Sequence, residues 1–321
     1  MRERIERIET QRSMQYRAVA ADAFSAQRQL LWDLCYRVTG TAGDADLVLR
    51  DCYARAVERP LVDRDADWRP HLIYSAATLA MDVLRRRKRR QYVGAWLPSP
   101  IETGNAASRD PRPHTTTGLR YDMVESGSMG FLKALETLEP RERIVFVMCD
   151  AFGFHVHDAA STLEYTSASV RTLLQNARRK MQRYDVAHEA PTRPVQAQVA
   201  ALLRDCVGHI QSFDASRLEK MLALDGQAIF DSGGEFVAPS GNIFGSATVA
   251  RILTKFVRGT GPIRFSFQML NGLPAALGQA QGRPRWAKRF VLSVDARDGL
   301  VSEIHVILAT AKLTAVRFDS I

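Results

Sequence analysis

The stretch PRERIVFVMCDAFGFHVHDAASTLEYTSASVRTLLQNARRKM, residues 140–181, decides the fold at the centre of this chain. Its pattern predicts a helix that begins near Pro140 and ends before Gly153, because proline suits a first helical turn and glycine ends a helix. A short helix over about 156–163 and a longer one over about 167–183 follow. Two helices joined by a sharp turn, the second of them basic, are the elements of a helix-turn-helix.

The longer of these helices has two different faces. Its apolar residues, such as Val170 and Leu174, would dock on the preceding helices, and the opposite face offers side chains that reach base edges and phosphates. The candidate DNA-binding residues of this helix are Ser167, Arg171, Thr172, Gln175, Arg178 and Arg179. We expect Arg171 and Gln175 to contact bases, and the following basic residues, Lys180 included, to contact phosphates. An ordinary amphipathic helix with a solvated basic face is the alternative.

Helical periodicity also runs through residues 21–92, with helices expected at about 23–40, 44–58 and 68–90. The third ends in six consecutive basic residues, of which Arg86, Arg87, Arg89 and Arg90 are the candidate DNA contacts. Such a run attracts phosphates. It also complements the negative end of a helix dipole, so a solvated helix end explains it as well. Together with the second basic helix, the run suggests a protein that grips DNA at two places.

Two stretches rich in turn-forming residues divide the chain. Residues 98–128 begin PSPIETGNAASRDPRPHTTTG and bury too little apolar surface to order their backbone, so we expect a flexible linker. Residues 188–194, HEAPTRP, form a second break. Beyond it, helical patterns at about 196–213, 215–224 and 246–258 are combined with strand-like runs at about 263–269, 289–294 and 301–308. We expect an α+β domain with a curved, mostly antiparallel sheet.

Length and composition favour a folded, multidomain protein. The 321 residues are too many for one ordinary domain, and 46% hydrophobic with 25% charged residues is unlike a disordered chain. No apolar run is long enough to cross a bilayer, and the charged N-terminus lacks the apolar stretch of a secretory signal. We therefore expect a cytoplasmic protein that does not engage a membrane. The net charge of +9 is by itself weak evidence for a polyanionic partner, and the clustering of basic residues is the stronger signal.

The sequence predicts neither a metal site nor a cofactor. The four cysteines lie far apart, so we expect reduced thiols. His155 and His157 have no third ligand nearby. No glycine-rich phosphate loop or nucleophile elbow occurs.

Several segments together are similar to a known family. LLWDLCYRVTG at 30–40, DADLVLRDCYARA at 44–56 and the basic helix that ends at residue 90 resemble region 2 of the extracytoplasmic-function (ECF) sigma factors of bacterial RNA polymerase. The segment 135–154 with the helix-turn-helix resembles their region 4. YVGAWLPSP at 92–100 resembles the Tyr-Val-Gly-Pro-Trp-Leu-Pro-Glu-Pro signature of the subgroup that carries a C-terminal SnoaL-like domain.

The C-terminal part resembles the same subgroup. AIFDSGGEFVAP, residues 228–239, is similar to its Asp-Gly-Gly-Gly motif, and ILATAKLTAV, residues 307–316, to its Asn-Pro-Asp-Lys-Leu motif. Ser232 replaces a glycine, and Ala309, Thr310 and Ala311 replace Asn, Pro and Asp. The resemblance implies an interdomain, regulatory role for Tyr92, Trp96, Leu97, Asp231, Gly233, Gly234, Lys312 and Leu313. We expect Trp96 to be buried between domains; the alternative is that it caps its own helical domain.

The resemblance implies two all-α sigma domains followed by an α+β SnoaL-like (NTF2-like) cone domain. The expected division is an N-terminal extension (1–20), a region 2-like domain (21–92), a linker (93–130), a region 4-like domain (131–185), a linker (186–195) and a SnoaL-like domain (196–318). Its implied partners are core RNA polymerase and promoter DNA, with a small ligand in the C-terminal pocket as a further option. Asp46 and Asp51 are the implied polymerase contacts, although Leu47 and Arg50 depart from the family pattern. Trp68, Arg69 and Tyr74 are weaker promoter candidates.

Two other functions remain open at this point. The chain is alternatively a SnoaL-like enzyme or ligand-binding protein with a vestigial DNA-binding half. Acid-base chemistry would then need a carboxylate and a histidine that converge in the pocket, and the available candidates are Asp231, His209 and His305. It is alternatively a helix-turn-helix regulator that acts without polymerase. The first interpretation, a sigma factor directing polymerase to specific promoters and not an enzyme, accounts for more of the chain.

Overall fold

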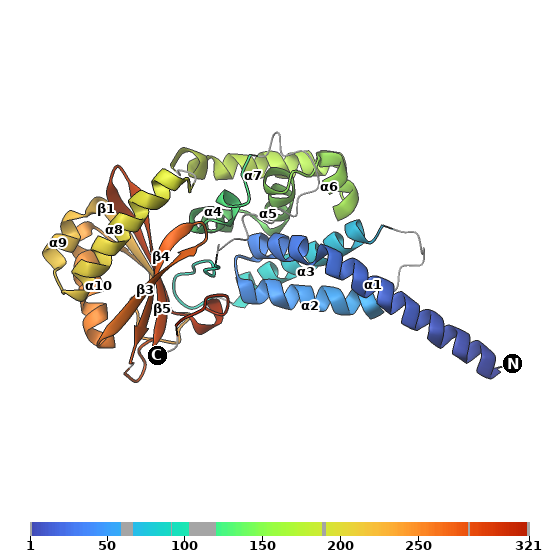
Figure 1. The fold of residues 1–321 in the computed structure, drawn as a ribbon. Coiled ribbons are helices and arrows are strands. Elements are labelled where there is room, and N and C mark those ends of the chain that lie inside the picture. The colour runs from blue at the N-terminus through green and yellow to red at the C-terminus, as the bar shows by residue number, and fades with distance from the viewer. Residues whose placement is uncertain are drawn as a thin grey trace.

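The computed structural model describes residues 2–58, 67–90, 92–102, 120–187, 191–281 and 283–319. The N-terminal third is a bundle of three helices, α1 (Arg2–Thr39), α2 (Ala42–Glu58) and α3 (Trp68–Arg90). The first helix begins far earlier than its expected start near residue 23. Residues 2–20 contain neither glycine nor proline, so nothing in the sequence stops the helix there. The expected N-terminal extension is therefore the first half of α1 (Figure 1).

The central part is a second helical bundle. It comprises η2 (Glu125–Gly127), α4 (Met129–Ala134), η3 (Leu135–Thr137), α5 (Pro140–Phe146), η4 (Val147–Ala151), α6 (Val156–Leu163) and α7 (Ser167–Ala187). Glu139 and Glu142 form a capping box at the start of α5, and Pro140 occupies its first turn. Glu164, in the left-handed conformation with φ 56°, ends α6 and makes the sharp turn before α7. The helix expected from residue 140 to about 152 ends as the π-helical turn η4.

The two helical bundles share one hydrophobic core. Buried side chains of α3 such as Leu72 belong to the same cluster as Leu132 of α4 and Leu174 of α7, and α3 packs against α5 and α6. The sequence suggested two halves held apart by a flexible tether. In the structure they are packed together, and residues 103–119 of the expected linker lie outside the described residues.

The C-terminal part is an α+β domain. Its helices are α8 (Arg193–Gln211), α9 (Ala215–Lys220) and α10 (Ser246–Thr260), and its strands are β1 (Leu222–Asp231), β2 (Asn242–Phe244), β3 (Ile263–Leu270), β4 (Leu273–Ala280), β5 (Arg289–Arg297) and β6 (Leu300–Ile307), followed by η5 (Thr310–Lys312). The strand order is β2-β1-β6-β5-β4-β3. Neighbouring strands are antiparallel except β1 and β6, which are parallel.

Three strands, β1, β2 and β4, differ from the sequence expectation. The helix expected over 215–224 ends at Lys220, and β1 begins two residues later. Strand β4 has the sequence LPAALGQA, which contains no β-branched residue, so it lacked a local strand signal. Its burial comes from its position inside the sheet, between β3 and β5.

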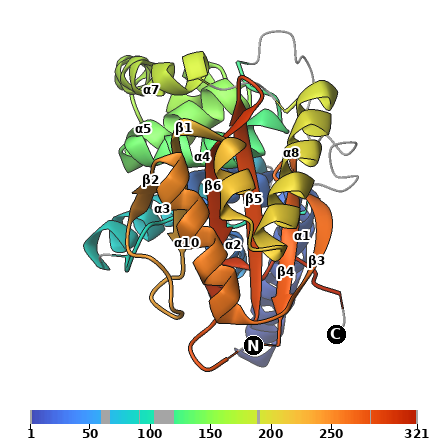
Figure 2. The ribbon, with the colours of Figure 1, turned by 90° about the vertical axis from the view of Figure 1, so that its left-hand side faces the viewer.

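Both faces of the sheet are buried, and each face packs against a different part of the molecule. On one face, Phe230 and Ile304 pack with α8, α9 and α10 in the domain's own core (Figure 2). On the other face, Ile229 and Ile307 pack against Leu97, Met129 and Val316 in a separate cluster. Because side chains alternate along a strand, one face of the sheet packs on the C-terminal helices and the other face packs on the rest of the molecule.

The β3–β4 turn joins this sheet to both helical bundles. Asn271 is 2% exposed and left-handed (φ 51°), and its amide donates to the Tyr36 hydroxyl (2.7 Å) and the Gly127 carbonyl (2.8 Å). Its Oδ1 accepts from the backbone N–H of Ile101 (3.1 Å). One side chain thus connects α1, the segment 92–102, the start of the second bundle and the sheet. Among the described residues, no helix is long and apolar enough to span a membrane.

We expect Asn271→Gly to lower stability by about 1 to 3 kcal/mol, because glycine keeps the turn but leaves buried polar partners unpaired. Asp298→Gly is the matched control, since Asp298 has the same left-handed conformation (φ 53°) in the exposed β5–β6 turn. Scanning calorimetry of the full chain compares the two variants. Equal melting temperatures would show that the Asn271 side chain contributes nothing to the packing of the three parts.

Candidate DNA-binding surfaces and the domain junction

Helix α7 presents the predicted polar face to solvent. Arg171, Thr172, Gln175 and Arg179 are exposed. The helix is capped by Thr166, whose Oγ1 accepts from the backbone N–H of Ser169 (3.1 Å), and half-exposed Ser167 is its first residue. This surface has the side-chain types and the exposure that base and phosphate contacts require.

Two of the basic residues expected to contact phosphate, Arg178 and Lys180, form ion pairs within the bundle. Arg178 donates two hydrogen bonds to Asp150, at 2.9 and 2.6 Å, and Asp150 is 3% exposed. Lys180 pairs with Glu142 at 2.6 Å, beside the capping box of α5. These contacts anchor α7 to the helices beneath it, which leaves Arg171, Gln175 and Arg179 as the freer candidates for DNA contact.

The basic run at the end of α3 is divided between solvent and the second bundle. Arg86 and Arg89 are exposed, and Arg85 pairs with Asp82 of its own helix. Arg87 is half-buried: it forms a bidentate pair with Glu136 (2.7 and 2.8 Å) and donates to the Thr39 carbonyl. The side chain of Arg90 lies outside the described residues.

Acidic residues of the second bundle therefore form ion pairs with some of the basic residues of the run. Glu136 also accepts from Arg143 (2.7 Å), which is 2% exposed and donates to the Val38 carbonyl. Lys88 pairs with Glu139 at 3.0 Å. Between the run and α5 lies a groove of about 730 Å³, lined by Arg85, Lys88, Arg89, Glu139, Pro140, Arg141, Glu142 and Leu173.

Trp96 lies between the first bundle and the C-terminal domain. The Arg87 guanidinium is 4.2 Å from the centre of the indole ring, and the Lys312 ammonium is 4.4 Å from it. The edge of the indole faces Gly40, where an added Cβ would lie 2.5 Å from the ring. The half-buried ring thus contacts its own helical domain, through Arg87 and Gly40, and also the C-terminal domain, through Lys312.

Asp231, at the end of β1, is the polar centre of this junction. It is completely buried and accepts from the Tyr92 hydroxyl (2.6 Å), the Leu97 N–H (2.7 Å) and the Gly233 N–H (3.3 Å). Lys312 pairs with it and also donates to the Leu97 carbonyl. Burial lowers the pKa of Lys312 to about 8, although Asp231 acts in the opposite direction. The pair is thus satisfied by hydrogen bonds on both sides, as a buried ion pair requires.

The flanking motif residues shape the same junction. Gly233 and Gly234 both have positive φ, and the ring hydroxyl of Tyr92 and the side chain of Val93 lie against them. Leu313 packs on the cluster that contains Leu97. The Ala-Thr-Ala replacement at 309–311 keeps the turn, because Glu235 accepts from the Thr310 N–H (3.1 Å).

The expected polymerase contacts lie on α2. Asp46 and Asp51 are exposed, and Asp46 accepts from the indole N–H of Trp32 at 2.8 Å. Two exposed apolar side chains, Leu47 and Tyr53, are on the same helix.

The three residues offered for an enzyme do not meet in one pocket. Asp231 is saturated by the donors of the junction. His305 lies on the sheet face toward the helical bundles, because its neighbours Ile304 and Val306 are in the opposite core with α8. His209 is on α8 and therefore on the other side of the sheet. The arrangement that the enzyme alternative requires is therefore not formed by these three residues.

Sequence reasoning missed two residues that organise the site. Glu136, which joins the basic run to the second bundle, has no distinguishing local pattern. Asn271 has one, since the Asn-Gly dipeptide after the strand-like run 263–269 is a strong signal for a hairpin turn. His155 and His157 are both exposed.

Comparison with known proteins agrees with this arrangement. The family model for sigma-70, region 4 matches residues 128–181, which include the helix-turn-helix. The ECF RNA polymerase sigma factor SigJ of Mycobacterium tuberculosis is 27% identical over 304 residues, 91% of this chain and 92% of that protein. The probable ECF sigma factor SigI of the same species is 27% identical over 306 residues, 92% of this chain and 96% of that protein.

A solved structure extends the likeness to the fold. The crystal structure of M. tuberculosis SigJ superposes with a TM-score of 0.66 at 25% identity, covering 93% of this chain and all of that one. The class defined by the fold and the helix-turn-helix is thus a protein that joins a sigma-70 region 4 segment and a preceding helical bundle to an α+β C-terminal domain. Within that class, the chain is a homologue of the ECF RNA polymerase sigma factors.

We expect Gly40→Ala to displace Trp96 and raise its quenching by acrylamide, because the new methyl group would overlap the indole. Gly94→Ala is the matched control: Gly94 also has positive φ (+86°) but has no atom within 4 Å of the added Cβ. Both variants carry the backbone strain of about 1 kcal/mol, and only the first carries the clash. The chain has four tryptophans, so the signal of Trp96 is the difference from a Trp96→Phe background.

Equal quenching in Gly40→Ala and Gly94→Ala would contradict the close packing of the indole on α1.

Proposed function

We propose that the protein is an ECF-type sigma factor that directs core RNA polymerase to specific promoters in the cytoplasm. The observation that carries this proposal is the exposed Arg171–Gln175 face on the second helix of a sigma-70 region 4 helix-turn-helix. The similarity to named ECF sigma factors over nine-tenths of the chain supports it. It favours transcription initiation over an enzyme with a vestigial DNA-binding half.

The parts take different roles in this proposal. The domain bounds are those expected from the sequence, with 21–92 as the region 2-like part, 131–185 as the region 4-like part and 196–318 as the C-terminal domain. The α7 face reads the distal promoter element, and Arg86 and Arg89 face the promoter where it melts. Exposed Asp46 and Asp51 on α2 contact the polymerase.

The C-terminal domain tunes this activity by holding the compact arrangement. One observation supports that role: Trp96 contacts both Arg87 of the basic run and Lys312 of the C-terminal domain. The second bundle adds to this arrangement, because its Glu136 and Glu139 pair with Arg87 and Lys88. A DNA-binding run that is paired with acidic side chains must exchange them for phosphates. A partner such as polymerase shifts this equilibrium only if it binds the opened arrangement more tightly.

A small ligand in the C-terminal domain is a weaker part of the proposal. The sheet face toward the bundles is covered by Leu97, Met129 and Val316. A ligand on that face would have to displace protein side chains.

We expect Arg171→Ala to cost about 1 to 3 kcal/mol in promoter binding and to relax sequence preference at one position, because a base contact is lost. Arg179→Ala, on the same helix, should weaken binding to all sequences alike. Selection of bound sequences from a random DNA pool distinguishes the two effects. Unchanged binding of Arg171→Ala to every sequence would remove Arg171 from the interface.

The function itself is tested by transcription in vitro with purified core polymerase on a genomic DNA pool. The wild-type chain should co-purify with core polymerase and yield discrete transcripts, and the Arg86→Ala/Arg89→Ala variant should lose open-complex formation. Because both arginines are exposed, its circular dichroism and melting temperature should stay unchanged. Arg251→Ala/Arg264→Ala removes the same charge from exposed sites of the C-terminal domain and should transcribe normally.

A wild-type chain that neither binds core polymerase nor initiates transcription would refute the sigma-factor proposal. Normal promoter melting by Arg86→Ala/Arg89→Ala would show that the basic run is only a solvated helix end.

A further inference from the structure

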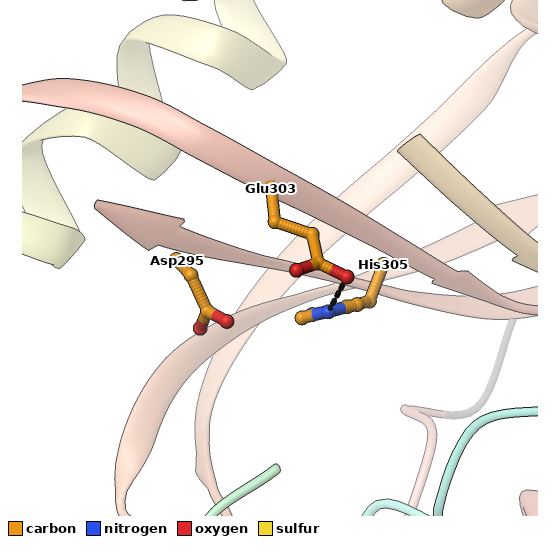
Figure 3. A group of neighbouring side chains, drawn as sticks. All are labelled: Asp295, Glu303 and His305. Carbon is orange, nitrogen blue, oxygen red and sulfur yellow. Dashed lines mark ion pairs between the residues drawn. The ribbon is translucent and has the colours of Figure 1, made fainter. Parts of the chain in front are cut away.

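Three potential ligand side chains gather on the sheet face that looks toward the helical bundles. Asp295 of β5 and Glu303 of β6 are direct cross-strand partners, and His305 of β6 is opposite Ser293. The carboxylate oxygens of Asp295 and Glu303 and an imidazole nitrogen of His305 all lie within 4.8 Å of one another. Figure 3 shows the Glu303 carboxylate and the His305 ring side by side, with the Asp295 carboxylate near them.

The imidazole of His305 is completely buried, and its Nε2 has no hydrogen-bond partner among the described residues. Its Nδ1 is 3.4 Å from the Ser293 hydroxyl. Nε2 lies only 3.0 Å from Oε1 of Glu303, but the two are not aligned for a hydrogen bond. Nε2 and Oε1 form an ion pair, but Nε2 makes no aligned hydrogen bond, which is unusual for a buried polar atom.

The separation of these atoms is that of two ligands around one ion. Bonds of about 2.0 to 2.2 Å from a metal to nitrogen and oxygen place neighbouring ligand atoms about 3 to 3.5 Å apart, with each atom directed at the metal and not at the other ligand. The Nε2 to Oε1 distance and the poor alignment both fit this geometry. The adjacent Asp295 supplies a third ligand from the neighbouring strand.

We propose that Asp295, Glu303 and His305 form a binding site for a divalent transition-metal cation, with Zn²⁺ as the best match. Two carboxylates and one imidazole give Zn²⁺ three ligands and leave a fourth position for water. The mixed oxygen and nitrogen donor set suits Mn²⁺ as a second choice, whereas Mg²⁺ and Ca²⁺ prefer oxygen alone.

Lys133 of α4 competes with the metal in this arrangement. Its ammonium pairs with Oε1 of Glu303, the same oxygen that is next to His305. Lys133 thus supplies the positive charge that the carboxylates require while the second bundle is docked on the sheet. A metal ion and the Lys133 ammonium cannot both occupy this position, because they would repel each other at contact distance. Metal binding therefore favours release of the second bundle from the sheet.

The experiment is calorimetric titration of the untagged full chain with ZnCl₂. We expect one equivalent to bind, and Asp295→Asn or Glu303→Gln to weaken binding by at least about tenfold, because removing a ligand costs no less than removing an outer partner of one. Asp225→Asn is the matched control, since this exposed carboxylate on β1 pairs, among the described residues, with Arg297. Far-ultraviolet circular dichroism checks that each variant is folded.

A second pair of variants tests the competition. Lys133→Met should strengthen Zn²⁺ binding by about fivefold, the scale of a modest ion pair. Lys180→Met, which removes a paired lysine on the neighbouring α7, should leave it unchanged.

Zn²⁺ binding that is equally tight in the wild type, Asp295→Asn and Glu303→Gln would place the metal elsewhere, for example on cysteine, and would overturn the proposal. The absence of any stoichiometric binding, in the wild type and in Lys133→Met alike, would also overturn it. The readout needs neither polymerase nor DNA, so its failure is separate from any failure of the proposed function.

Discussion

The buried Asp231–Lys312 pair is the interaction on which the arrangement of this molecule depends. A charge removed from water is tolerated only when it is paired and its remaining hydrogen-bonding positions are filled. Here the filling groups come from the segment that follows the basic helix: the Tyr92 hydroxyl and the Leu97 N–H both donate to Asp231. The C-terminal domain therefore cannot bury its own ion pair unless that segment is in place.

From this pair the remaining contacts extend outward in both directions. Lys312 and Arg87 both lie against the Trp96 ring. Arg87 in turn joins Glu136 of the second bundle, and Asn271 closes the assembly from the tip of the β3–β4 turn. Each of these residues contacts at least two parts of the chain, so a change at one of them is felt by the others.

Sequence reasoning reached the class of fold and most of the helices, because periodic apolar faces and helix-ending residues are local signals. It proposed Trp96, Asp231 and Lys312 together on the strength of a family resemblance, and spacing alone would not have joined residues so far apart in the chain. It missed β4, which is a strand only because its neighbours pair with it. It also misjudged the separation of the two bundles, because Glu136 and Arg143 have ordinary helical surroundings in the sequence and their burial is a property of packing.

The carboxylates that hold the basic run have a consequence for ionic strength. A lysine or arginine that neutralises a phosphate releases a cation condensed on the DNA, but one that leaves a carboxylate to do so exposes a negative charge that attracts a cation again. In the proposed promoter complex, Arg87 would enter from such a pair, whereas Arg86 and Arg89 would enter from solvent. The acidic side chains thus act as an internal substitute for the DNA backbone. The slope of promoter affinity against salt concentration would then correspond to fewer phosphates than the number of basic residues in the interface suggests.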